Sequence, residues 1–275
     1  MTPKKIVYYT DEVHEDFAAT NGKIGRDRVD GTYRYSRRSV LWKIGVFCVY
    51  RLFVTPVVWL WTRIWLGLRV RNRRAIRSLR GEGCFLYMNH TQDICDAYIP
   101  TAACFPKRAC IVTGPEAVSI PGIRVLVAML GAIPLPSDVA AARNYYARLG
   151  EEMQKGAAVT IFPEAHIWPY CNFVRDFPDT SFSYPVKLGA PVIAGVLVYR
   201  ERRFLRRHHP HATLYLSDPI RPDPDLSLRQ ARRKLRDEAY RFMQETAQRE
   251  GSCVYIEYRK RTEWEEESAP AAQSE

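Results

Sequence analysis

The sequence predicts an α/β fold, a mixed sheet flanked by helices, with an N-terminal apolar helical hairpin for membrane association. From residue 83 onward, short apolar runs typical of strands alternate with longer segments of helical periodicity. Several of these runs are apolar at every position, as expected for strands buried on both faces of a sheet. Before them, residues 40–70 form the most apolar stretch of the chain.

Six strands are expected, and two long helices lie between or after them. The strands are placed at residues 84–88, 109–112, 132–135, 158–162, 191–198 and 212–216. The helices are placed at residues 138–155 and 226–249, and Gly251 is expected to end the second. Residues 253–258 are predicted to form a last extended piece.

The apolar stretch before the sheet contains charges at Lys43, Arg51 and Arg63 and a proline at Pro56. No uncharged run in it reaches the roughly 20 residues that span a bilayer. We therefore expect two short helices that meet near Pro56 and lie in a membrane interface, because proline interrupts a helix. A pair of core helices is the alternative. Four tryptophans favour the interface, namely Trp42, Trp59, Trp61 and Trp65.

The charge of the chain predicts an anionic partner. It has 41 Lys and Arg against 30 Asp and Glu in 275 residues, a formal net charge of +11, and five of the acids lie in residues 263–275. Arginines cluster at residues 69–80, directly after the Trp-rich stretch, which favours membrane lipids over nucleic acid as partner. No RNA-binding motif accompanies the charge, so no nucleic-acid partner is expected.

Seven cysteines are widely spaced and form no C-x-x-C pair, which argues against a disulfide framework and a structural zinc site. The first residues turn acidic too soon for a signal-peptide core. These features predict a peripheral or monotopic protein on the cytoplasmic face of a membrane. The histidines at residues 208–211 are expected in a basic surface loop, with no metal site.

Two segments at strand ends carry groups suited to catalysis. His90 follows the strand at residues 84–88, and Asp93 and Asp96 follow it closely. A carboxylate that holds one ring nitrogen of a histidine makes the other nitrogen an effective base. Glu164, in Phe162-Pro-Glu164, ends the strand at residues 158–162. Strand ends in α/β sheets are where sites are built.

Together these segments resemble the glycerophospholipid acyltransferase family, whose members carry Asn-His followed by Asp, then a glycine-containing block, Phe-Pro-Glu-Gly and a Pro-rich strand. The resemblance covers roughly residues 83–200. It implies that His90 is the catalytic histidine and Asp96 its partner, although one extra residue separates the two here. Asp93 is a rival partner, since positions i and i+3 share a helix face.

The other blocks imply the substrate-binding residues. Asn89, Gly131 and Glu164 match positions of the family blocks, but the arginines that bind the acceptor phosphate are replaced by Pro136 and Ile167. Another cation must then offset the phosphate's charge. Arg175 and Lys187, between the third and fourth blocks, are preferred over Arg124 and Arg143.

The resemblance implies an acyltransferase of phospholipid biosynthesis that needs no cofactor or metal. It would move a fatty acyl group from an acyl-CoA or acyl carrier protein thioester to a hydroxyl of a lysophospholipid, namely 1-acylglycerol 3-phosphate, with neutral His90 as general base. A different lipid acceptor and a non-enzymatic binder of anionic lipid remain alternatives. A covalent route through Cys95 is disfavoured, because an acidic neighbour does not activate a thiol.

Four segments are expected along the chain. Residues 1–38 form an N-terminal surface segment, and residues 39–80 form the membrane-association segment. Residues 81–258 form the acyltransferase domain, and residues 259–275 an acidic, disordered tail.

Overall fold

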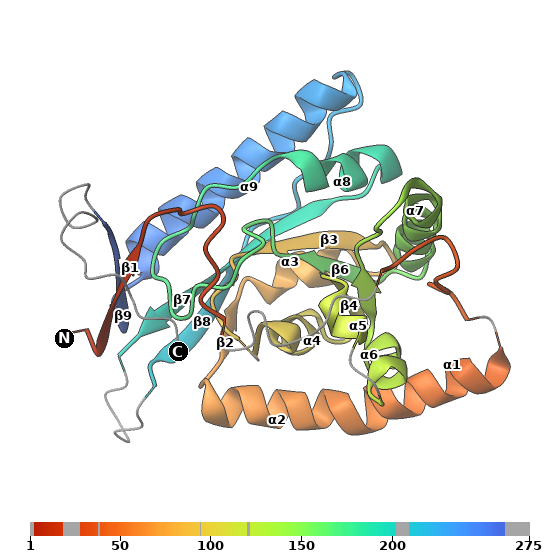
Figure 1. Ribbon diagram of the computed structural model, residues 1–275, viewed down its shortest axis with the longest axis horizontal. Coiled ribbons are helices and arrows are strands. Elements are labelled where there is room, and N and C mark those ends of the chain that lie inside the picture. Colours follow the sequence, from red (N-terminus) through yellow and green to blue (C-terminus); the bar gives the residue numbers. More distant parts are fainter. Residues whose placement is uncertain are drawn as a thin grey trace.

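The computed structural model describes residues 3–18, 28–37, 39–93, 95–119, 122–201 and 209–261. The basic loop up to His208 and the acidic tail from residue 262 lie outside these residues. The described chain forms a twisted sheet covered by helices on both faces, with one long helix along its base (Figure 1).

A seven-stranded mixed sheet forms the centre of the protein, which confirms the predicted fold class. Strands β7, β3, β6, β4 and β5 are parallel, β8 is antiparallel to β7, and β2 is parallel to β8. In spatial order the strands are β2 (Arg69–Arg71), β8 (His211–Leu216), β7 (Val192–Arg200), β3 (Cys84–Met88), β6 (Ala158–Ile161), β4 (Ala109–Thr113) and β5 (Ala132–Pro134).

Strand β3 shows why the strand runs are apolar at every position. Leu86 and Met88 pack into one core layer, and Phe85 and Tyr87 into the other. Successive side chains of a strand point to opposite faces, so a strand covered on both sides needs apolar residues throughout. The first layer is closed by α3 (Arg73–Ser78) and α4 (Ile99–Cys104), and the second by α7 (Val139–Gln154), α8 (Ser183–Leu188) and α9 (Leu228–Glu250).

The two long predicted helices are α7 and α9, and side chains cap both. The carboxylate of Asp138 accepts the N–H of Ala141 at 2.7 Å, and Ser227 and Gln230 form a capping box at the start of α9. Two short helices, α5 (Glu116–Ser119) and α6 (Arg124–Leu130), connect β4 to β5. Single 3₁₀ turns are η2 (Cys95–Ala97) and η3 (Thr180–Phe182).

The apolar N-terminal segment is one continuous helix, so the predicted hairpin is wrong. Helix α1 (Val40–Phe47) passes through a π-helical stretch, η1 (Cys48–Val54), into α2 (Thr55–Trp65). The wider π turns accommodate Pro56 near the start of α2, and the Thr55 hydroxyl donates to the Tyr50 carbonyl at 2.6 Å. Within the described residues this 26-residue helix is the one that is long and apolar enough to cross a membrane by length and composition.

Two segments expected outside the α/β domain are built into it or onto it. Residues of the arginine cluster form β2, an edge strand of the main sheet, and α3. The N-terminal segment, expected on the surface, contributes β1 (Lys5–Tyr9), which pairs in parallel with β9 (Ile256–Lys260). Strand β9 confirms the last extended piece, although it starts three residues later than expected.

Candidate active site

His90 lies just beyond the carboxyl end of β3, and its ring is held by Asp96. Nδ1 of His90 is 2.8 Å from Oδ2 of Asp96, and the Asp96 side chain is 1% exposed. The same oxygen accepts the backbone N–H of Thr91 at 2.8 Å and of Gln92 at 2.9 Å. One carboxylate oxygen therefore fixes both the ring and the loop that carries it. Asp93 is exposed, and the structure pairs His90 with Asp96 despite the extra residue between them.

The imidazole of His90 is oriented for proton transfer. Its ring stacks on Phe162, with centroids 4.3 Å apart and an interplanar angle of 18°, and the side chain remains 17% exposed. An ionised carboxylate only accepts hydrogen bonds, so Nδ1 carries the proton that faces Asp96. The lone pair of Nε2 is then left to accept a proton.

Asn89 ties the His90 loop to β7 rather than facing a substrate. Its amide nitrogen donates to the Leu197 carbonyl at 3.0 Å, and its amide oxygen accepts the Leu197 N–H at 2.7 Å. The register of β3 with β7 ends at Met88 and Gly195, so the side chain extends the ladder by one step. Asn89 is 1% exposed. The structure thus gives it a positioning role in place of the expected substrate contact.

A second anchor holds the residues after His90. The buried hydroxyl of Tyr199, on β7, lies 2.7 Å from Thr91 Oγ1 and accepts from the Gln92 amide at 2.8 Å. It also donates to the Thr91 carbonyl at 3.1 Å. No sequence signal indicates this role, because Tyr199 lies inside an apolar strand, where packing is the ordinary expectation.

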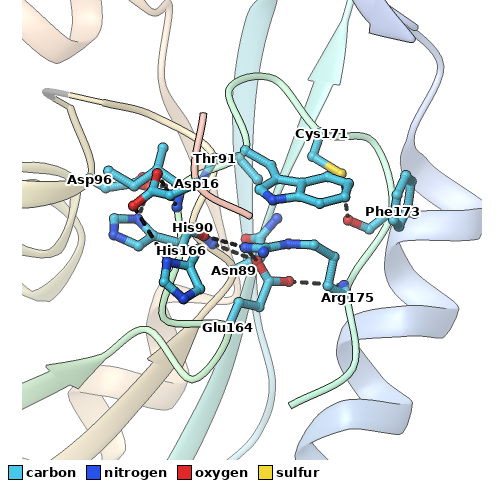
Figure 2. A network of polar contacts seen from close by, with 12 residues as sticks. Asp16, Asn89, His90, Thr91, Asp96, Glu164, His166, Cys171, Phe173 and Arg175 are labelled. Atoms are coloured by element: carbon cyan, nitrogen blue, oxygen red, sulfur yellow. Dashed lines mark hydrogen bonds and ion pairs between the residues drawn. The ribbon is translucent and has the colours of Figure 1, made fainter. Parts of the chain in front are cut away.

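Glu164 is fully engaged by the protein. Its Oε2 accepts the backbone N–H of His90 at 3.1 Å and Nη2 of Arg175 at 3.0 Å, and its Oε1 accepts the backbone N–H of Arg175 at 3.1 Å (Figure 2). Burial raises the pKa of Glu164 above its usual value, and the Arg175 guanidinium opposes that rise. Glu164 therefore links the ends of β3 and β6, next to His90, the candidate base.

Arg175 does not occupy the position expected of a phosphate ligand. Its side chain is 1% exposed, and its guanidinium lies 4.8 Å from the Trp168 ring centroid while it bonds Glu164. Nε and Nη1 are buried and have no hydrogen-bond partner in the described part of the chain. A cation under an indole and bonded to a buried carboxylate supports the loop. This geometry favours a structural role over the expected contact with the acceptor.

Lys187 and Gly131 are also placed away from His90. Lys187 is exposed near the end of α8, which precedes the start of β7, whereas His90 follows the end of the parallel strand β3. The chain between the third and fourth blocks thus turns to the opposite edge of the sheet. Gly131 ends α6 with a φ of 100°, and a Cβ there would lie 2.9 Å from the Ala109 carbonyl. Its role is to let the chain turn into β5.

The N-terminal segment packs over the loop after Glu164, which the sequence did not predict. Trp168 Nε1 donates to the Glu15 carbonyl at 2.8 Å, and the Phe17 N–H donates to the Ile167 carbonyl at 3.0 Å. Asp16 Oδ2 lies 3.5 Å from Nδ1 of His166 (Figure 2). Residues 15–17 therefore form a strap over residues 166–168. The contacts connect parts of the chain about 150 residues apart, as in the Asp16–His166 pair. A local sequence pattern therefore cannot predict them.

A cavity of about 280 Å³ lies beside the His90 loop. Trp61 and Trp65 of α2 form one side of it, and Thr91, Gln92 and Cys95 line it from the loop. Burial, followed by the charge of Asp96, raises the pKa of Cys95 to about 12. A thiol with that pKa is protonated at neutral pH and is a poor nucleophile. The cavity joins the Trp-rich end of the apolar helix to the loop of the candidate base.

Comparisons with known proteins agree with this site. The family model described as Acyltransferase matches residues 67–198, which include His90, Asp96 and Glu164. No curated protein matches the chain. A solved structure, the 1-acyl-sn-glycerophosphate (LPA) acyltransferase PlsC from Thermotoga maritima, shares the fold with a TM-score of 0.54 and 18% identity. The similarity covers 78% of this chain and 89% of that one.

The fold, the histidine–aspartate pair and the matched domain define an acyltransferase. The match spans residues 67–198, and the motifs around His90 and Glu164 that resemble the glycerophospholipid acyltransferase family lie within it. The chain's long apolar helix suggests association with a membrane.

Proposed function

We propose that the protein transfers a fatty acyl group from an acyl thioester to the free hydroxyl of 1-acylglycerol 3-phosphate on the cytoplasmic surface of a membrane. The observation that carries this proposal is the His90–Asp96 pair, 2.8 Å apart at the end of β3 within the matched domain. The solved relative with the same fold is described as an acyltransferase for 1-acyl-sn-glycerophosphate, which supports this acceptor.

The proposed reaction needs one general base and no acyl-enzyme. Nε2 of His90 takes the proton of the acceptor hydroxyl while that oxygen attacks the thioester carbonyl. The tetrahedral oxyanion collapses, the carbon–sulfur bond breaks, and the thiolate leaves with the proton returned from the imidazolium. Asp96 keeps the tautomer and stabilises the imidazolium. The acyl donor is acyl-CoA or an acylated carrier protein, because both supply a thioester.

The apolar helix supports delivery of the lipid from a membrane. Its outward face exposes large apolar side chains along its whole length, including Leu41, Ile44, Phe53, Leu60 and Ile64. Its inner face is buried at Tyr50, Val58 and Thr62. A helix of 26 residues is about 39 Å long, and this one packs lengthwise on the domain (Figure 1). We propose that it lies in the interface, with the cavity beside Trp61 and Trp65 open to lipid.

The test is product analysis by mass spectrometry. Purified protein would be incubated with mixed acyl-CoA and acyl carrier protein thioesters and with a panel of lysolipids that differ in headgroup. Formation of phosphatidic acid from 1-acylglycerol 3-phosphate, absent with the His90→Ala variant, is the expected result. Transfer only to lysolipids with another headgroup would show that the acceptor is not 1-acylglycerol 3-phosphate. No transfer to any lipid would refute the proposal.

A further inference from the structure

A second and larger cavity lies at the opposite edge of the sheet from His90. Its volume is about 490 Å³. Arg108, directly before β4, and Ala132, at the start of β5, line it. Both strands run parallel to β3 through β6, and His90 follows the far end of β3. The strands therefore separate this cavity from the acyl-transfer site by their full length.

The cavity is strongly basic. Seven Lys and Arg side chains line it, and Glu152 is its one acidic lining residue among the described residues. Glu152 is already paired with Arg148 at 2.9 Å and with Lys155 at 2.7 Å. The remaining lining cations are Arg34, Arg37, Lys43, Arg51 and Arg108. An excess of cations in a concave site concentrates positive potential and attracts anions.

Several of these cations have hydrogen-bonding capacity left. Within the described ranges, Arg34 and Lys43 are exposed and have no carboxylate partner. Arg108 donates from Nη2 to the Met129 carbonyl at 2.9 Å, but its buried Nε has no hydrogen-bond partner in that part of the chain. A buried guanidinium N–H without an acceptor costs free energy unless a ligand supplies one. An anion in the cavity would satisfy it.

One wall of the cavity is apolar and continues onto the surface of the long helix. Trp42, Val46 and Phe47 of α1 line it. Phe47 is 58% exposed, and Leu41 and Ile44 expose 82% and 55% of their surface on the same helix. A ligand that fits both the basic lining and the apolar wall carries an anionic group joined to an apolar tail. This favours a phospholipid over a free phosphate compound.

We propose that this cavity binds the phosphate of an anionic membrane phospholipid whose acyl chains lie along the exposed face of α1. The site is separate from the acceptor site, so it holds the protein on anionic membranes without taking part in acyl transfer. Arg34 and Lys43 contact the phosphate from the mouth of the cavity, and Arg108 contacts it from inside.

The test compares vesicles of phosphatidylcholine with vesicles that also contain phosphatidylglycerol, which is neither the proposed acceptor nor its product. The full chain is sedimented with each kind, without acyl donor, so the result does not depend on the proposed reaction. The Arg34→Gln/Lys43→Gln variant should lose about tenfold or more of its affinity for the anionic vesicles and keep its affinity for the neutral ones. Both residues are exposed, so the melting temperature should not change.

The matched control removes two exposed arginines on the far side of the protein, by Arg229→Gln/Arg233→Gln on α9 (Figure 1). It should retain nearly full affinity. Equal loss in the two double variants would mean diffuse attraction to the whole basic surface and would overturn the proposal. CoA is used to test whether the cavity binds a soluble phosphate compound instead of a lipid. If CoA binds the wild type and not Arg34→Gln/Lys43→Gln, while vesicle binding is unchanged, the ligand is a soluble phosphate compound and the lipid proposal is wrong.

Discussion

The backbone N–H of His90 donates to Oε2 of Glu164 at 3.1 Å, and this carboxylate also holds the buried Arg175. The ends of two neighbouring strands, β3 and β6, are thereby locked together at the candidate base. The side chain of His90 is held from the other side by Asp96. Positioning of the base thus depends on two carboxylates that bond different parts of one residue.

Removal of the base should abolish transfer without unfolding the protein. His90→Ala is expected to lower kcat by at least about 100-fold, the range that general-base catalysis contributes. Asp96→Asn should lower kcat strongly too, because the amide N–H can donate to Nδ1 and so favour the wrong tautomer of His90. The matched control is Asp93→Asn, an exposed position that should leave kcat nearly unchanged. Steady-state kinetics measure these effects. A larger loss of kcat in Asp93→Asn than in Asp96→Asn would assign the role of His90's carboxylate partner to Asp93.

Arg175→Met should destabilise the protein rather than weaken acceptor binding selectively. Breaking a buried ion pair costs about 3 kcal/mol or more. Glu164 has a pKa raised by burial, and loss of Arg175 would raise it further. The deficit should therefore grow as the pH rises, because protonated Glu164 tolerates the missing cation and ionised Glu164 does not. Denaturant unfolding at several pH values measures this. An unchanged stability with a higher KM for the charged acceptor alone would restore the phosphate role.

The strands and the histidine–aspartate pair could be predicted because the signals are local. Strand β3 is apolar at five successive positions, and Asp96 follows His90 closely enough to fold back on it. Strand β2 was missed because an edge strand of three residues, two of them charged and exposed, has no apolar run.

The cation sites could not be predicted because they depend on the path of the chain in space. The guanidinium of Arg175 packs against the Trp168 ring, and the indole of Trp168 in turn donates to the Glu15 carbonyl of the N-terminal strap. Lys187 is carried to the far edge of the sheet by α8. The continuous helix through Pro56 was missed for a related reason, since the π-helical stretch before it is stabilised by Tyr50, which accepts the N–H of Ala109 at 2.9 Å.

Asn89→Ala should reduce both stability and activity. The variant leaves the N–H and carbonyl of Leu197 buried without the two bonds that Asn89 makes, at a cost of about 1–3 kcal/mol. The His90 backbone then loses its fixed position, so kcat should fall more than KM changes. Asn144→Ala is the control, because Asn144 makes one exposed bond to the Gly31 carbonyl at 3.3 Å. Equal melting temperatures for the two variants would contradict the positioning role.

Cys95→Ser should retain most of the acyl-transfer rate. The thiol has a pKa of about 12 and is therefore protonated at neutral pH, although it lines the cavity beside the His90 loop. Iodoacetamide at neutral pH should accordingly inactivate the enzyme slowly. Trapping of an acyl group on Cys95 by mass spectrometry, together with loss of activity in the serine variant, would establish a covalent route instead.

The long apolar helix should hold the protein on a membrane from one side. Phe53 is 67% exposed and Leu60 is 53% exposed on its outer face. Phe53→Asp/Leu60→Asp should weaken binding to neutral vesicles at least about tenfold, because each substitution removes an apolar side chain from the interface and adds a charge. Val139→Asp/Leu228→Asp is the control, since these exposed residues lie on α7 and α9. Its vesicle binding should match the wild type.

Protease accessibility then separates a helix that lies in the interface from one that crosses. The inner face of the helix is buried against the domain at Tyr50 and Val58, so crossing would require the helix to leave its packing partners. With protein added to sealed vesicles, sites before Val40 and after Trp65 should both be cleaved from outside. Protection of one flank alone would show a spanning helix, and it would also place the basic cavity near α1 on one defined side of the bilayer. Cleavage of both flanks together with loss of binding in Phe53→Asp/Leu60→Asp requires a helix that enters the interface from one face only, because no spanning arrangement leaves both ends exposed to the same protease.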